Sequence, residues 1–139
     1  MMYRKMQSKQ LAPPQKVLVI SSDTMLGEIT TKIISRYFGC EIYTAMNASE
    51  AASYLYSGGF DLAIMDLSTQ GLSGPMMVRK IQSVPRNVSI LVIADIDNNE
   101  SLEEIQGLGI NQIIYKPIKM VQMLELITGI LLESQQIFV

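Results

Sequence analysis

Short apolar runs alternate along the chain with longer segments in which apolar residues recur at every third or fourth position. A run of about four to eight apolar residues is typical of a buried strand, whereas a spacing of three and four indicates an amphipathic helix. We expect strands over the apolar runs at 16–21, 41–44, 61–66, 88–94 and 111–115. We expect helices over the periodic segments at 24–38, 47–57, 75–84, 100–108 and 119–135.

Several boundaries of these elements carry local signals of their own. Asn47 is followed three positions later by Glu50, a spacing close to a capping box at the start of a helix. Gly58-Gly59 breaks that helix, and Pro75 suits the first turn of the next one. These signals support the placement of the second and third helices.

The alternation of strand and helix, repeated five times, predicts the fold class. Short buried strands separated by helices form a parallel sheet with helices on both faces. Five repeats in a chain of 139 residues fit a single α/β domain, doubly wound and flavodoxin-like, with strand order 2-1-3-4-5. A closed eight-stranded barrel needs about twice this length.

The two ends of the chain differ in character from the region between them. Residues 1–15 carry three basic residues and no acidic one, and they include Pro13-Pro14. We interpret this segment as a polar basic tail that is disordered, because it lacks an apolar pattern that could pack. We therefore place the folded domain at 16–135 and interpret 136–139 as a short C-terminal tail.

Composition excludes several classes of function. The chain has no histidine, so histidine-based acid–base catalysis, Ser-His-Asp triads and histidine metal sites are impossible. Its single cysteine, Cys40, excludes an internal disulfide and a cysteine-based zinc site. A net charge of −2 gives no electrostatic case for direct nucleic-acid binding. The apolar runs are much shorter than the about 20 residues of a membrane-spanning helix, so we expect a soluble, cytoplasmic protein.

Charged side chains gather where the expected strands end. Asp23 follows the first strand, Asp66 closes the third, Asp95 follows the fourth and Lys116 closes the fifth. In a doubly wound sheet these ends meet at one edge, which is where ligands bind. Asp66 ends an otherwise apolar strand, where a carboxylate is costly unless it is paired, and Lys116 is the obvious partner. A structural salt bridge and a functional site both fit this pair.

Three segments taken together are specific for one known family. The segment Asp61–Asp66 (DLAIMD) is followed by Gly71–Gly74 (GLSG), which places a glycine eight residues after the last aspartate. Lys116-Pro117 closes the fifth strand, and Asn47–Leu55 matches the capped helix that the family has after its second strand. On these segments, residues 16–134 resemble a response-regulator receiver domain of two-component signalling.

The resemblance implies a signalling module and not an enzyme. Asp66 is the implied acceptor of a phosphoryl group from a sensor histidine kinase, a phosphotransfer protein or a small phosphodonor, and Lys116 is implied to stabilise that group. The implied cofactor is Mg²⁺, held by Asp23, Asp66 and the backbone carbonyl of Ser68. A cis peptide bond between Lys116 and Pro117 and a downstream protein partner are implied as well.

The chain departs from the family pattern at four functional positions. The acidic pair that follows the first strand in receivers falls on Ser21 and Ser22, so Mg²⁺ binding is expected to be weakened or absent. The Thr or Ser after the fourth strand falls on Ala94, and the aromatic switch residue of the fifth strand falls on Ile113. Without these groups, phosphorylation lacks its usual pull on the loop after the fourth strand.

Three hypotheses about function remain open. The first is a phosphorylatable receiver with an atypical metal site. The second is a pseudo-receiver, a protein-interaction module that acts independently of phosphorylation. The third is a flavodoxin-like cofactor carrier, suggested by Ser21-Ser22 with Thr24 and Gly27. The third is disfavoured, because it leaves the other matching segments unexplained and the chain has no tryptophan to stack on a flavin.

Two surface features complete the expectations. Asp95 and Asp97 are interpreted as exposed acids of the loop that follows the fourth strand; the alternative is that they point inward, where they would oppose a phosphoryl dianion. Met120 and Met123 are expected on a face beside the last strand, where a homodimer would cover them.

Overall fold

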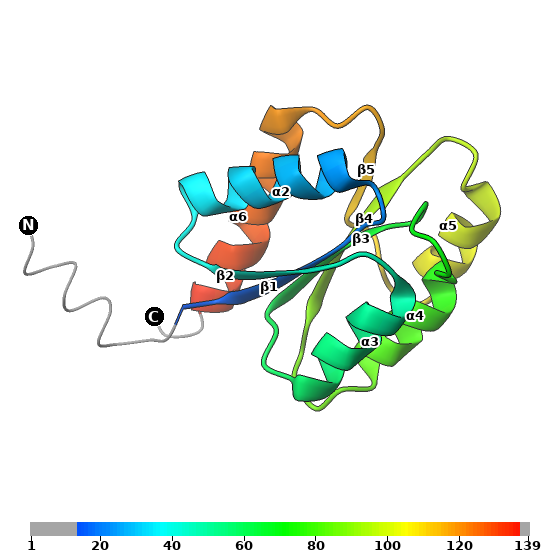
Figure 1. Cartoon of the computed structure of the whole chain (residues 1–139), viewed down its shortest axis with the longest axis horizontal. Coiled ribbons are helices and arrows are strands. Elements are labelled where there is room, and N and C mark those ends of the chain that lie inside the picture. The colour runs from blue at the N-terminus through cyan, green and yellow to red at the C-terminus, as the bar shows by residue number, and fades with distance from the viewer. Residues whose placement is uncertain (1–13, 137–139) are drawn as a thin grey trace, which may run out of the picture.

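The computed structural model describes residues 14–136, and within this range the predicted architecture is confirmed. Five parallel strands form a sheet in the order β2-β1-β3-β4-β5 (Figure 1). The strands are β1 (Lys16–Ile20), β2 (Glu41–Ala45), β3 (Leu62–Asp66), β4 (Ser89–Ala94) and β5 (Ile113–Tyr115). The helices are α2 (Thr24–Tyr37), α3 (Ala48–Ser57), α4 (Gly74–Gln82), α5 (Asn99–Gly107) and α6 (Met120–Gln136).

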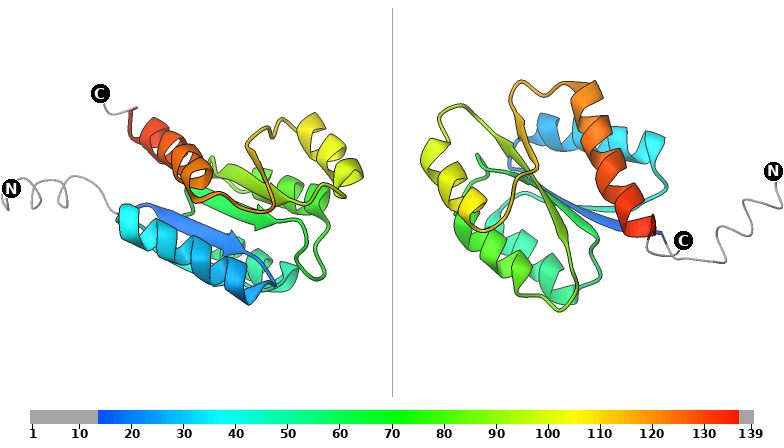
Figure 2. Two further views of the ribbon diagram at one scale, coloured as in Figure 1. Left: turned by 90° about the horizontal axis from the view of Figure 1, so that it is seen from above. Right: turned by 180° about the vertical axis from the view of Figure 1, so that it is seen from behind.

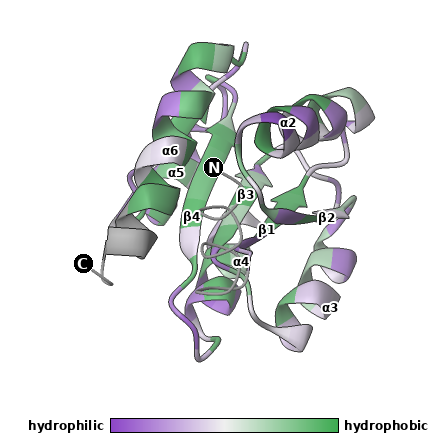
Figure 3. Cartoon of the chain, turned by 90° about the vertical axis from the view of Figure 1, so that its left-hand side faces the viewer, coloured by the Kyte–Doolittle hydropathy of each residue, from purple (hydrophilic) through white to green (hydrophobic). Residues whose placement is uncertain are grey.

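The helices lie on both faces of the sheet, as the alternating pattern predicts. Helices α2 and α6 cover one face, and α3, α4 and α5 cover the other (Figures 1 and 2). Each face therefore has its own apolar core, with alternate residues of β1, β3 and β4 pointing to opposite sides. Figure 3 shows that β4 is hydrophobic over most of its length, as expected for a strand buried on both faces.

Several local signals in the sequence act as predicted. The Asn47 side chain accepts a hydrogen bond from the Glu50 amide at 2.9 Å, and the Glu50 carboxylate accepts one from the Met46 amide at 2.7 Å. Pro75 lies in the first turn of α4. The predicted capping arrangement is thus confirmed, and it fixes the direction in which α3 leaves the sheet.

The two ends of the domain differ slightly from the expected boundaries. Residues 1–13 of the expected disordered tail lie outside the described residues. Gln15, placed in that tail by the sequence pattern, is part of the fold, because its carbonyl accepts from Glu41 N and its side chain donates to Leu131 O. At the C-terminal end, α6 continues through Gln136, one residue beyond the expected boundary. Within the domain, β5 is two residues shorter than expected.

The expected apolar face on α6 is only partly present. Met120 is half exposed, whereas the Met123 side chain is fully buried against the sheet with Ile127 and Leu131, so placing Met123 on an exposed face was wrong. Residues three apart on a helix lie on nearly the same side, so Met123 belongs to the buried stripe with Ile127, while Met120 stays half exposed because it is the first residue of α6. Among residues 14–136, no helix has the length and apolar character needed to cross a bilayer.

Candidate functional site

Asp66 lies at the carboxyl end of the central part of the sheet. It closes β3, which pairs with β1 on one side and with β4 on the other. Only 1% of its surface is exposed, and the four preceding residues of the strand are all buried apolar side chains. A carboxylate in this position needs polar partners, because burial removes it from water.

Both oxygens of the Asp66 carboxylate have such partners. Oδ1 lies 3.2 Å from Lys116 Nζ and accepts a hydrogen bond from the Ser68 amide at 3.0 Å. Oδ2 accepts a hydrogen bond from the Ser21 hydroxyl at 3.0 Å. The predicted pair of Asp66 and Lys116 is therefore present, and it is supported from the loops after β1 and β3.

Lys116 also contacts groups beyond Asp66. Its backbone N–H donates to the carbonyl of Ala94 at 2.9 Å, which holds the end of β5 beside the end of β4. Its Nζ lies 3.3 Å from Ser68 Oγ and 3.9 Å from Asp95 Oδ2. The peptide bond between Lys116 and Pro117 is cis, as the resemblance implied.

Asp95 was interpreted as an exposed loop acid, and its side chain is 44% exposed, but it also contacts the site. Its carboxylate accepts a hydrogen bond from the Ser68 hydroxyl at 2.9 Å and lies 3.9 Å from Lys116 Nζ, so the interpretation holds only in part. The reason lies in the register, since Ala94 pairs with Tyr115 and the next residue of each strand is Asp95 or Lys116. Asp97, two residues further on, is exposed as predicted.

Asp23, the third expected metal ligand, is engaged elsewhere. Its side chain caps α2, where Oδ1 accepts a hydrogen bond from the Leu26 amide at 3.2 Å, and the residue is exposed. The Ser21 hydroxyl, which accepts from the Asp23 amide at 3.1 Å, is the group that reaches Asp66 instead. In the described part of the chain, no three or more Asp, Glu, Cys or His side chains are grouped to hold a metal.

Two hydroxyl groups, of Thr69 and Ser22, fix the loop after β3 through contacts that the sequence did not predict. Thr69 Oγ1 donates to the Asp66 carbonyl at 2.6 Å and lies 3.4 Å from the Ile20 carbonyl. Ser22 Oγ accepts from the Gln70 amide at 3.2 Å. Hydroxyl residues next to a strand end often bond to the backbone in this way, and that is the only signal that pointed to them.

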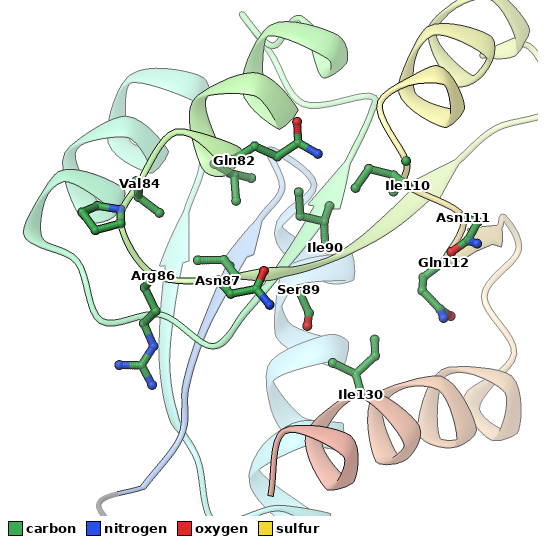
Figure 4. Close-up of a pocket in the computed structure, with 14 residues that line it drawn as sticks. Gln82, Val84, Arg86, Asn87, Ser89, Ile90, Ile110, Asn111, Gln112 and Ile130 are labelled. Carbon is green, nitrogen blue, oxygen red and sulfur yellow. The ribbon is translucent and has the colours of Figure 1, made fainter. Parts of the chain in front are cut away.

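A separate cavity of about 480 Å³ lies at the opposite edge of the sheet, at the amino ends of β4 and β5 (Figure 4). Its lining includes Gln82, Arg86, Asn87 and Gln112 together with Ile130 of α6. This edge is remote from Asp66, since parallel strands place their amino and carboxyl ends at opposite edges of the sheet. The cavity therefore plays no part in the site around Asp66.

The family of the chain follows from comparison with known proteins. Residues 17–128 match the model of the response regulator receiver domain. The chain belongs to the response regulator receiver domain family. Receiver domains are generally signalling modules and not enzymes, and they interact with histidine kinases or phosphotransfer proteins and with downstream partners. They usually bind Mg²⁺ in an acidic pocket.

Curated relatives of this receiver are longer proteins. The transcription factor prr1 of Schizosaccharomyces pombe is 26% identical over 122 residues, which are 87% of this chain and 22% of prr1. The swarming motility regulation protein RssB of Serratia marcescens is 23% identical over 114 residues, which are 82% of this chain and 52% of RssB. The chain thus spans between about a fifth and a half of the length of these relatives.

Solved structures of receiver domains share its fold. The receiver domain protein described as CheY-like from Methanospirillum hungatei matches with a TM-score of 0.80 at 21% identity, over 88% of this chain and 98% of that one. The signal receiver domain from Bermanella marisrubri matches with a TM-score of 0.76 at 22% identity, over 85% and 98% of the two chains. The receiver therefore has the fold of its family.

Proposed function

We propose that this receiver accepts a phosphoryl group on Asp66 from a histidine kinase, a phosphotransfer protein or a small phosphodonor. The observation that carries the proposal is the buried carboxylate of Asp66 with the Lys116 ammonium 3.2 Å from Oδ1. A carboxylate and an ammonium at the carboxyl edge of a parallel sheet are the groups that an acyl phosphate requires.

The chemistry assigns a distinct part to each group. An oxygen of the Asp66 carboxylate attacks phosphorus, the new O–P bond forms, and the P–N bond of a phosphohistidine or the P–O bond of acetyl phosphate breaks. The electron pair of the broken bond stays with the leaving group. Lys116 offsets negative charge on the transferring group, while the Ser68 amide and the Ser21 hydroxyl orient the carboxylate.

The site fits the family's usual Mg²⁺ poorly. When bound in receivers, the ion offsets the charge of the phosphoryl group. The expected ligands here are Asp23, Asp66 and the Ser68 carbonyl, but Asp23 caps α2 and the usual acidic pair is replaced by Ser21 and Ser22. We therefore assign the ion no part in the transfer here, and we expect weakened or absent Mg²⁺ binding because neutral hydroxyls replace charged ligands.

A second candidate function is that of a pseudo-receiver, which binds protein partners independently of phosphorylation. The residues that favour it are Ala94, which cannot donate a side-chain hydrogen bond to a phosphoryl group, and Ile113, which is not aromatic. A phosphoryl group that makes no differential contacts in two conformations cannot shift the balance between them. In this case a partner would bind wild type and Asp66→Asn equally well.

The bounds, location and partners of the domain are proposed as well. We propose that residues 16–135 form a receiver domain that works in the cytoplasm through a downstream protein partner. Its candidate homodimer would use the exposed Met120, together with the exposed side chains of Tyr115 at the end of β5 and Val121 in α6. Light scattering at high protein concentration tests the dimer, and a monomer at all concentrations would contradict it.

Intact-mass analysis after incubation with acetyl phosphate, with and without Mg²⁺, tests the proposed acceptor. We expect the wild type to gain one phosphoryl group and Asp66→Asn to gain none. Asp61→Asn is the matched control, because it removes a carboxylate from the other end of the same strand, and it should be labelled like the wild type. If the folded wild type gains nothing, the pseudo-receiver is the better description.

A further inference from the structure

Asp95 contacts two donor groups that lie beside the Asp66 carboxylate, the Ser68 hydroxyl and the Lys116 ammonium. The Asp95 carboxylate accepts the hydroxyl hydrogen of Ser68 at 2.9 Å and lies 3.9 Å from Lys116 Nζ. Lys116 Nζ in turn lies 3.2 Å from Asp66 Oδ1, so two carboxylates share one ammonium. The Asp95 side chain is 44% exposed and that of Lys116 is 24% exposed, which leaves this side of the site open to solvent and solutes.

A phosphoryl group on Asp66 would need the same donors. Its terminal oxygens carry close to two negative charges and are stabilised by ammonium and hydroxyl groups. Ala94 supplies no side-chain donor, so Lys116 Nζ and Ser68 Oγ are the side-chain donors that this edge offers next to Asp66 Oδ1. A hydroxyl has one hydrogen to donate, and in this structure Ser68 donates it to Asp95.

We propose that Asp95 is an internal anionic competitor, which occupies Lys116 and Ser68 and so opposes the binding of a phosphoryl group or other tetrahedral anion beside Asp66. If Asp66 is the phosphoryl acceptor, as proposed above, this competition favours the unphosphorylated state of the receiver. It adds a positioning residue that acts through Lys116 and Ser68. Like charges repel at close range, so a phosphoryl dianion and the Asp95 carboxylate compete for the one ammonium of Lys116.

Asp95→Asn tests the competition with little change of shape. Asparagine keeps an oxygen that can accept from Ser68, but it loses the charge that holds Lys116. Asp97→Asn is the matched control, because it removes the same charge two residues away from an exposed side chain. Two readouts are compared in the full chain, namely the rate of labelling by acetyl phosphate and the affinity for inorganic phosphate followed by amide NMR shifts of Ser68 and Ala94.

We expect Asp95→Asn to raise both the labelling rate and the phosphate affinity by on the order of tenfold, which corresponds to about 1.4 kcal/mol. Asp97→Asn should change either quantity by less than about twofold, since an exposed charge is screened. The gain in Asp95→Asn should shrink as salt is added, which a purely structural effect on the loop would not do. Thermal unfolding of the three proteins verifies that each is folded.

The two readouts separate this proposal from the proposed function. Tighter phosphate binding in Asp95→Asn without labelling of any protein would support the competitor and contradict Asp66 as acceptor. Labelling of all three proteins at one rate, with equal phosphate affinity, would overturn the competitor and leave the acceptor in place. Absence of any phosphate binding to folded Asp95→Asn overturns the competitor as well.

Discussion

Strand β3 is bounded by two aspartates that differ in burial and in their partners. Asp61 precedes the strand, and Asp66 ends it. Asp61 pairs with Arg86, whose side chain is 55% exposed, and accepts a hydrogen bond from the Lys16 amide at 2.8 Å. Asp66 is almost fully buried and pairs with Lys116.

The contrast shows that pairing with a cation does not by itself mark a functional site. Asp61 bonds the backbone at the first residue of β1, so it ties two strand starts together at the amino edge of the sheet. The partners of Asp66 come from loops at the carboxyl edge, and Lys116 remains partly open to solvent. The edge of the sheet and the kind of partner therefore separate a structural carboxylate from a reactive one.

The largest expected difference between the two ends is in phosphoryl transfer. Replacing Lys116 by Ala should slow labelling of Asp66 by about a hundredfold or more, because it removes the cation that offsets charge on the transferring group. Arg86→Ala removes the cation that pairs with Asp61 and should leave labelling within about twofold. Initial rates with acetyl phosphate, measured by intact mass, compare the two variants. Equal rates in both would contradict the role given to Lys116.

For stability we expect the opposite order, with a larger effect of substitution at Asp61 than at Asp66. Asp61→Ala should lower the free energy of unfolding by about 1–3 kcal/mol, because the Lys16 amide and Arg86 lose their acceptor. Asp66→Asn should change it by less than about 1 kcal/mol, since asparagine still accepts hydrogen bonds and Lys116 keeps Asp95 as a partner. Urea denaturation followed by circular dichroism measures both. A larger loss in Asp66→Asn than in Asp61→Ala would reverse the comparison.

The smallest effect concerns Cys40, which is half-buried. Burial, with a smaller contribution from the Asp61 charge, raises the pKa of the Cys40 thiol above its ordinary value. Asp61→Asn should therefore lower this pKa slightly and increase the thiolate fraction at a given pH, so that iodoacetamide reacts faster by less than about threefold. Alkylation rates across pH test this, with Asp66→Asn as the control that should match the wild type.

Most of the fold was accessible from the sequence because its signals are local and repeated. Strand positions followed from apolar runs, and Asn47 with Glu50 marked a helix start correctly. It was harder to predict which residues of each helix face the core. In α2, Ile29 and Tyr37 share the helical spacing of the apolar residues, yet both are about half exposed, whereas Thr30 and Ile34 are buried. Apolar side chains that share a stripe can still lie at its solvent edge.

The site was predicted less completely, because its contacts depend on register and on side-chain direction. The pair of Asp66 and Lys116 followed from strand ends and from the family resemblance. The inward contact of Asp95 depends on how β4 and β5 align, which no local pattern records. Asp23 was expected only as a metal ligand, although an aspartate directly before a helix is also a preferred cap, which is the role that the structure gives it. The roles assigned to Asp66, Lys116 and Ser68 in phosphoryl transfer stay predictions.

The groups around Asp66 lie far apart along the chain, and this has a consequence for how the protein assembles. Ser21 and Asp66 are 45 residues apart, Ser68 and Asp95 are 27 apart, and Ser68 and Lys116 are 48 apart. Contacts of such long sequence separation cost chain entropy, which the rest of the fold has to offset. An anion that binds between these groups therefore selects molecules in which β1, β3, β4 and β5 are in register, and its binding reports the pairing of these four of the five strands.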